Sequence, residues 1–137
     1  MPIAERTAQV LLALPPDPSA ARRARVALHQ ARLPEDLQHT VDLLATEVIA
    51  NSIRHAGLRS DQQILFAARF AGDFVRVEVH DPGPGFDTGR ALEGKGFGLR
   101  MVDQLATRWG VEDANGVRVW FEVDRRPRGR FDRRPTV

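Results

Sequence analysis

Two stretches of alternating side chains, joined by a short glycine turn, restrict the fold more than any other feature of this chain. Apolar residues occupy every second position from 64 to 70 and again from 75 to 79, with Gly72-Asp73 between the two runs. A period of two is the pattern of a half-buried strand, and a two-residue turn containing glycine is typical of a β-hairpin. Because the opposite positions are mixed in character, we predict a sheet with one buried face.

Two further segments are expected to be strands of the same sheet. Residues 8–14 are predicted to form an edge strand, which ends at Pro15-Pro16. Residues 117–123 alternate in the same way after Asn115-Gly116, a dipeptide that favours a hairpin turn. Most strand neighbours are therefore expected to run antiparallel.

The segments between these strands show apolar residues at helical spacing. A first helix is expected from Asp17, a candidate N-cap, to about Arg32. A second and longer one is expected from residue 33 to residue 56, with Gly57 as the stop, and a third after residue 98. The predicted fold class is α/β: a two-layer α/β sandwich with a mixed, mostly antiparallel sheet and helices on one face.

Length and composition limit what this fold can carry. With 137 residues, 42% of them apolar, the chain is expected to form one compact domain. Cysteine is absent, which excludes disulfides and thiolate chemistry. No opening apolar run resembles a signal peptide or a membrane span, so we expect a cytoplasmic protein without a membrane partner.

The C-terminal end differs in charge from the rest. Residues 1–124 are expected to form the domain and residues 125–137 a basic tail. From residue 124 onward six arginines face two aspartates, whereas the whole chain has a net charge of only +2. Such a polar, arginine-rich tail is typical of solvated, disordered chain, although it could also contact nucleic acid or an acidic partner.

Three residues on the second predicted helix form the first candidate for chemistry. Glu47, Asn51 and His55 recur every four residues, so they form a stripe about 12 Å long on one helix face. The amide oxygen of Asn51 suits Mg²⁺, which prefers oxygen ligands. The carboxylate of Glu47 is placed to accept a proton during phosphoryl transfer. An ordinary solvated helix face would also explain this spacing.

The second candidate follows the hairpin directly. Asp81-Pro82-Gly83-Pro84-Gly85 is predicted to be a stiff turn with bare backbone, which a flat ring could approach closely. The carboxylate of Asp81 could accept a hydrogen bond from the exocyclic amine of adenine. A plain surface turn is the alternative.

The third candidate is Gly94-Lys95-Gly96-Phe97-Gly98, which leads into the third predicted helix. It is not a dinucleotide fingerprint, because Leu99 stands where glycine is required, and it is not a P-loop, because Gly96 replaces the Ser or Thr that binds Mg²⁺. Its backbone N–H groups and the helix start could bind an anion, with the charge of Lys95 added. Residues 86–93 could form a short lid, and a loop that merely needs glycine is the alternative.

Together these motifs resemble a known group of ATP-binding domains. Glu-x-x-x-Asn, Asp-x-Gly-x-Gly and Gly-x-Gly-x-Gly, in this order, look like the N, G1 and G2 boxes of the GHKL superfamily, which has the Bergerat fold and includes gyrase, heat-shock chaperones, histidine kinases and mismatch-repair ATPases. The runs at 43–57 and 96–102 look most like bacterial anti-sigma factor serine kinases. The resemblance covers residues 8–124.

The resemblance implies a role for each motif. Glu47 would be the general base, Asn51 would hold Mg²⁺, and Arg22 matches by position an arginine that contacts protein partners in this family. The implied nucleotide-binding residues are Asp81, Gly83, Gly85, Gly94, Lys95, Gly96, Phe97, Gly98, Leu99 and His55. The sequence departs from the family at Arg118, where members often carry a threonine that supports the adenine site. We therefore expect adenine to be held more weakly or in a different way.

The predicted function is an ATP-binding anti-sigma regulatory factor that phosphorylates a serine or threonine of an anti-sigma factor antagonist. Its expected cofactors are ATP and Mg²⁺, and its expected partners are a sigma factor, the antagonist, or both. Family members are commonly dimeric, so a homodimer is compatible with the resemblance. The alternatives are an ATP-gated protein-binding module without kinase activity and a stand-alone histidine-kinase-like ATPase domain. Direct nucleic-acid binding through the tail ranks last.

Overall fold

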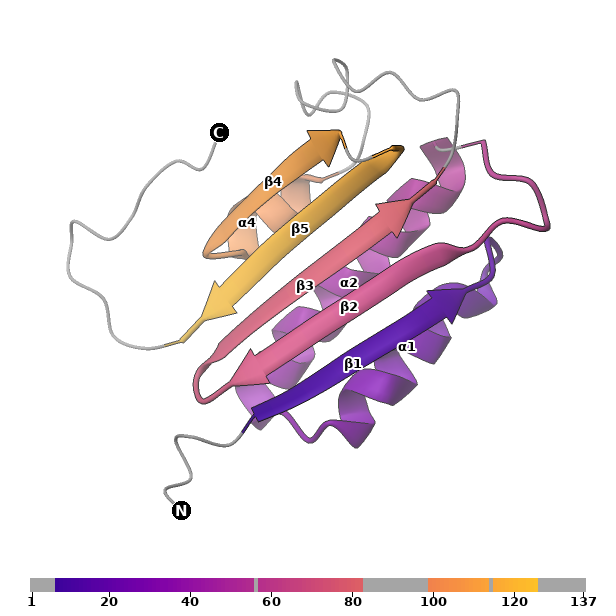
Figure 1. Ribbon diagram of the computed structural model, residues 1–137. Helices are drawn as coiled ribbons and strands as arrows, with labels where there is room; N and C mark the ends of the chain where they lie inside the picture. The colour runs from indigo at the N-terminus through magenta and orange to yellow at the C-terminus, as the bar shows by residue number, and fades with distance from the viewer. Residues whose placement is uncertain (1–6, 56, 83–98, 114, 126–137) are drawn as a thin grey trace.

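The computed structural model describes residues 7–55, 57–82, 99–113 and 115–125. The elements, in chain order, are β1 (Thr7–Leu14), α1 (Ser19–Gln30), α2 (Glu35–His55), β2 (Ile64–Ala71), β3 (Phe74–Asp81), α4 (Arg100–Leu105), β4 (Arg108–Asp113) and β5 (Val117–Asp124). The five strands form one sheet in the order β1-β2-β3-β5-β4, as Figure 1 shows. All four pairings between described strands are antiparallel, in line with the prediction of a mostly antiparallel sheet.

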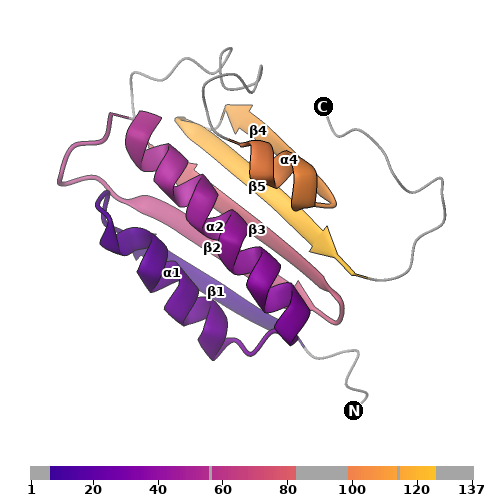
Figure 2. The same ribbon diagram turned by 180° about the vertical axis from the view of Figure 1, so that it is seen from behind.

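The three described helices lie on one face of this sheet, and the other face is open (Figure 2). Alternation explains the two layers, because successive side chains of a strand point to opposite faces. In β3 and β5 every second residue is buried and the residues between are half-buried. The prediction of a two-layer α/β sandwich with helices on one face is confirmed.

The core fills the space between the helices and the covered face of the sheet. The largest fully buried side chains include Phe66 of β2, Phe121 of β5, and Leu37, Leu44 and Ile49 of α2. Burying one such side chain contributes about 1.5–3 kcal/mol, so this interface holds most of the stability of the domain. Because α2 lies across the middle of the sheet, the core also fixes the position of the polar residues on that helix.

The helix ends follow the sequence signals closely. Asp17 Oδ1 accepts a hydrogen bond from the backbone N–H of Ser19 at 2.8 Å, as expected of a capping aspartate, and its hydrogen bonds with Ser19 lower its pKa. Helix α1 ends at Gln30, two residues before the predicted Arg32, because Arg32 takes a left-handed φ of 58°. Gly57, predicted to stop α2, has a φ of 63°. None of the described helices is long and apolar enough to cross a membrane.

Strand β4 was not predicted from the sequence. It lies at the edge of the sheet, its residues are half-buried or exposed without the alternation of β3 and β5, and Gly110 lies in its middle. The structure explains that glycine: a Cβ atom at this position would come within 2.7 Å of Nε1 of Trp120 on the neighbouring strand. Glycine inside a strand often marks such a close approach, and here it makes room for the indole ring.

Candidate functional site

The predicted site residues of α2 and β3 lie at one edge of the molecule. Helix α2 crosses the covered face of the sheet, and its C-terminal end lies beside the end of β3 and the start of β5 in both views (Figures 1 and 2). Glu47, Asn51 and His55 occupy the last three turns of α2, and Asp81 is the last residue of β3. The fold thus brings together two of the three motifs found in the sequence.

Asn51 is the most informative residue of this edge. It is only 4% exposed, and its Oδ1 has no hydrogen-bond partner among the described residues. No other buried side-chain nitrogen or oxygen among the described residues lacks a partner in this way. A buried acceptor without a partner costs about 1–3 kcal/mol, so an ordered water or a bound ion is expected at Asn51 Oδ1. An amide oxygen in this position fits a hard cation such as Mg²⁺.

Glu47 lies one helical turn before Asn51 on the same face. It is half-buried and makes no hydrogen bond or ion pair with any described residue. A carboxylate in this state is free to turn toward a ligand and to accept a proton from it. The pair therefore combines a possible cation ligand with a possible base. No three His, Cys, Asp or Glu side chains of the described residues gather as a metal site.

Asp81 ends β3 on the same covered face. It is 2% exposed and continues the buried row of Val75, Val77 and Val79. Its partner across the ladder on β5 is Val117. A carboxylate so deeply buried needs polar contacts to remain charged, so Asp81 is not a solvated surface group.

Arg118 lies on the opposite face from Asp81. Its guanidinium forms ion pairs with Glu112 at 3.4 Å and with Glu78 at 3.8 Å on the open side of the sheet. The side chain of Arg118 therefore points away from Asp81, and the effect of this departure on adenine binding stays a prediction. The residue that faces Asp81's side of the sheet is Val117, and counting the alternation from the Asn115-Gly116 turn would have identified it.

The remaining predicted site residues divide into two groups. Leu99 is 4% exposed and packs in the core, and His55 is exposed at the last position of α2. Because the side chain of Leu99 is buried, only its backbone could contact a nucleotide. The other predicted nucleotide-binding residues lie outside the described residues; they are Gly83, Gly85, Gly94, Lys95, Gly96, Phe97 and Gly98.

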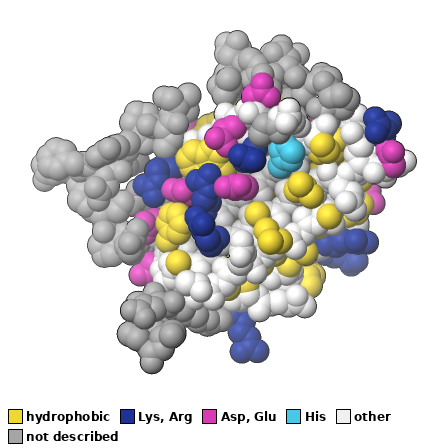
Figure 3. All heavy atoms as spheres, in the orientation of Figure 1, with side chains coloured by type: hydrophobic (Ala, Val, Ile, Leu, Met, Phe, Trp, Pro, Cys, Tyr) yellow, Lys and Arg dark blue, Asp and Glu magenta, His cyan; other side chains and the backbone are white. Residues whose placement is uncertain are grey.

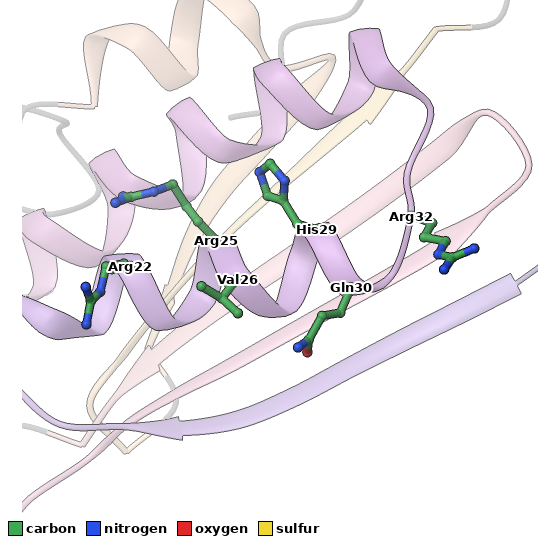
Figure 4. A pocket seen from close by; sticks show the side chains of 6 residues that line it. All are labelled: Arg22, Arg25, Val26, His29, Gln30 and Arg32. Atoms are coloured by element: carbon green, nitrogen blue, oxygen red, sulfur yellow. The ribbon is translucent and has the colours of Figure 1, made fainter.

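Arg22, predicted to contact a partner, lies on the exposed side of α1. It lines a surface depression of about 560 Å³ together with residues of the same helix and of the turn that follows it (Figure 4). These are Arg22, Arg25, Val26, His29, Gln30 and Arg32. Two contacts hold this helix to α2: Arg25 donates to Thr46 Oγ1 at 2.9 Å, and His29 Nε2 lies 2.7 Å from Asp42 Oδ2. The depression is basic, with Val26 as an apolar centre that is 52% exposed.

Comparison with protein-family models gives a match to the histidine kinase-like ATPase domain over residues 14–123. The chain belongs to this family. In this histidine kinase-like ATPase domain the match includes Glu47, Asn51 and Asp81, and it begins at the end of β1 and finishes within β5. The residues that form the site edge are thus part of the family's domain. No curated protein matches the chain at a significant level.

Among solved structures, the ATPase domain is similar to the crystal structure of the RsbU and RsbW domains of Rv1364c from Mycobacterium tuberculosis. The TM-score is 0.65 and the sequence identity 21%, over 85% of this chain and 32% of the other. The present chain therefore spans about a third of the length of that protein. The likeness confirms the fold of the domain.

Proposed function

We propose that the domain binds Mg-ATP at the edge formed by α2 and β3 and transfers the γ-phosphoryl group to a serine or threonine hydroxyl of a regulatory protein. The observation that carries this proposal is the buried Oδ1 of Asn51, which has no partner and lies one turn from the half-buried Glu47. Membership of the histidine kinase-like ATPase family supports ATP as the ligand. The resemblance to anti-sigma factor kinases supports the acceptor.

Each residue of the edge has a separate task in this proposal. The carboxylate of Asp81 accepts a hydrogen bond from the adenine amine and orients the base. Asn51 Oδ1 would hold Mg²⁺, which would supply positive charge to offset the charge that develops on the phosphate oxygens. The glycine segments at 83–85 and 94–98, with Lys95 and Phe97, complete the base and phosphate contacts, and His55 borders the nucleotide.

Glu47 acts on the acceptor protein. As the hydroxyl oxygen of the acceptor bonds to the γ-phosphorus and the bond to the β–γ bridging oxygen breaks, the hydroxyl proton passes to the Glu47 carboxylate. The reaction leaves ADP and a phosphoserine or phosphothreonine. A base of this kind contributes roughly 10²- to 10⁴-fold to the rate.

The basic depression on α1 is proposed as the docking surface for the protein partner. Arg22, Arg25 and Arg32 supply positive charge there, and Val26 supplies an apolar contact. An acidic segment of a sigma factor or of its antagonist would complement this surface. Such a surface would bring the acceptor to the helix that packs against α2 and hence toward Glu47.

The proposal is tested by Glu47→Gln, with Glu122→Gln on the open face of the sheet as the matched control. Both variants are incubated with Mg-[γ-³²P]ATP and an extract of the native cell, and phosphoserine and phosphothreonine are measured. Glu47→Gln is expected to bind Mg-ATP with normal affinity and to lower transfer at least about 100-fold, whereas Glu122→Gln transfers normally.

Two results would contradict the assignment. Full transfer by Glu47→Gln would exclude the role of this residue as base. Nucleotide-dependent partner binding by the unaltered protein, without any phosphorylated product, would favour an ATP-gated binding module instead.

A further inference from the structure

The turn between β4 and β5 lies directly against the end of β3. Asn115 and Gly116 form this turn, with φ angles of 55° and 121°. The next residue, Val117, pairs with Asp81 across the ladder, so the turn closes at the position where β3 ends. Sequence reasoning assigned Gly116 only to a hairpin turn.

Gly116 has no room for a side chain. A Cβ atom added there would overlap the carbonyl oxygen of Asp81 and lie 2.9 Å from the Cα of Pro82. Both neighbours are backbone atoms of β3 and the residue after it, so they cannot rotate aside as the tip of a flexible side chain could. Any other residue at 116 must therefore displace the Asp81–Pro82 peptide or the β4–β5 turn that packs on it.

We propose that Gly116 is a positioning residue for nucleotide recognition: by letting the β4–β5 turn pack on the Asp81–Pro82 backbone, it sets where the Asp81 carboxylate meets the adenine amine. Asp81 is 2% exposed, so its carboxylate direction depends on its backbone rather than on a free choice of rotamer. Recognition groups work only within about 0.5 Å of their productive position. This inference rests on the proposed role of Asp81 in binding adenine.

The test compares two ligands that differ at one group. ATP carries the exocyclic amine, and purine riboside triphosphate lacks it while keeping the ring, the ribose and the phosphates. In the unaltered protein we expect ATP to bind at least about tenfold more tightly, as a hydrogen bond to a charged group would predict. Gly116→Ala is expected to reduce this preference to less than about threefold, chiefly by lowering the affinity for ATP.

The ratio of the two affinities separates positioning from folding. A lower folded fraction reduces the apparent affinities for both ligands equally and leaves their ratio unchanged. Gly57→Ala is the matched control, because Gly57 also has a positive φ, of 63°, but no atom lies within 4 Å of the added Cβ. It is expected to keep the full preference for ATP. If Gly116→Ala folds poorly in buffer, the same ratio is measured in an osmolyte that strengthens folding.

Failure of the inference and failure of the proposed function give different results. If Asp81→Asn removes the preference for ATP but Gly116→Ala retains it, Gly116 does not position Asp81, and the function stands. If the unaltered protein shows no preference for ATP over purine riboside triphosphate, the role of Asp81 itself is wrong.

Discussion

Polar side chains on the two sides of the sheet differ in whether they have hydrogen-bond or ion-pair partners. On the open face, acidic and basic side chains lie together at the centre of the view in Figure 3. They form ion pairs with one another. Arg76 bonds Glu78 at 2.9 Å and Glu122 at 2.7 Å, and Arg108 bonds the other oxygen of Glu122 at 2.7 Å. Among the described residues on the covered side, Asn51 of α2 is buried with an acceptor that has no partner.

At the centre of the open face, the guanidinium of Arg76 has partners for its hydrogen bonds and its charge. Burial lowers the pKa of the Arg76 guanidinium, but its hydrogen bonds to Glu78 and Glu122 raise that pKa above the ordinary value overall. The same guanidinium lies 4.4 Å from the ring centroid of Trp120. Since all these groups have partners in the protein, they are structural, whereas Asn51 Oδ1 has none among the described residues, as our proposal of a Mg²⁺ ligand there requires.

Substitutions at two neighbouring residues of β5, one on each face, are expected to differ most in their effect on the unfolding free energy. Phe121 is fully buried on the covered face, and Trp120 lies half-buried on the open face. Phe121→Ala should lower the free energy of unfolding by about 3–5 kcal/mol, because it leaves a cavity in the core. Trp120→Ala should lower it by about 1–2 kcal/mol, since the lost area is partly exposed and the contact with Arg76 is modest.

Urea unfolding of the two variants measures this difference. Equal losses of unfolding free energy would show that side chains on the open face contribute as much to folding as the core does. The proposed difference between the covered face and the open face would then be wrong.

An effect smaller than that of Phe121→Ala is expected at Gly110, where the open face is tightly packed. An added methyl group would lie 2.7 Å from Trp120 Nε1, so Gly110→Ala should push the indole away from β4 at a cost of about 1–3 kcal/mol. The movement is followed by tryptophan fluorescence in a Trp109→Phe background, in which Trp120 is the remaining tryptophan. A red shift is expected, and an unchanged spectrum with unchanged stability would mean that Trp120 does not pack on Gly110.

Much of the fold could be predicted from residue patterns alone. Alternation in β2, β3 and β5, together with Gly57 and the Asn115-Gly116 turn, was enough to place the strands and the end of the long helix. Strand β4 could not be predicted in this way, because its residues do not alternate between buried and exposed. The glycine in its middle is explained only by the packing of Trp120 from the neighbouring strand.

The site was predictable to a similar degree. Helical spacing correctly placed Glu47 and Asn51 on one face, but no spacing rule could show that Asn51 Oδ1 is buried without a partner, since this depends on the surrounding core. The strand register places Arg118 on the open face, as the alternation of β5 also does, and its effect on adenine binding stays a prediction. The approach of Gly116 to Asp81 joins positions 35 residues apart and required the three-dimensional structure.

The decisive measurement is the unfolding free energy of Asn51→Ala with and without Mg-ATP, beside Ser52→Ala as the neighbouring buried polar control. At a ligand concentration a hundredfold above its dissociation constant, the unaltered protein and Ser52→Ala should each gain about 2.7 kcal/mol. Asn51→Ala should gain nothing from Mg-ATP, while its ligand-free stability stays within about 1 kcal/mol of the unaltered protein or rises, because the removed oxygen has no partner. A variant that keeps the full gain from Mg-ATP, or that loses several kcal/mol without ligand, would show that Asn51 serves the fold and not the nucleotide.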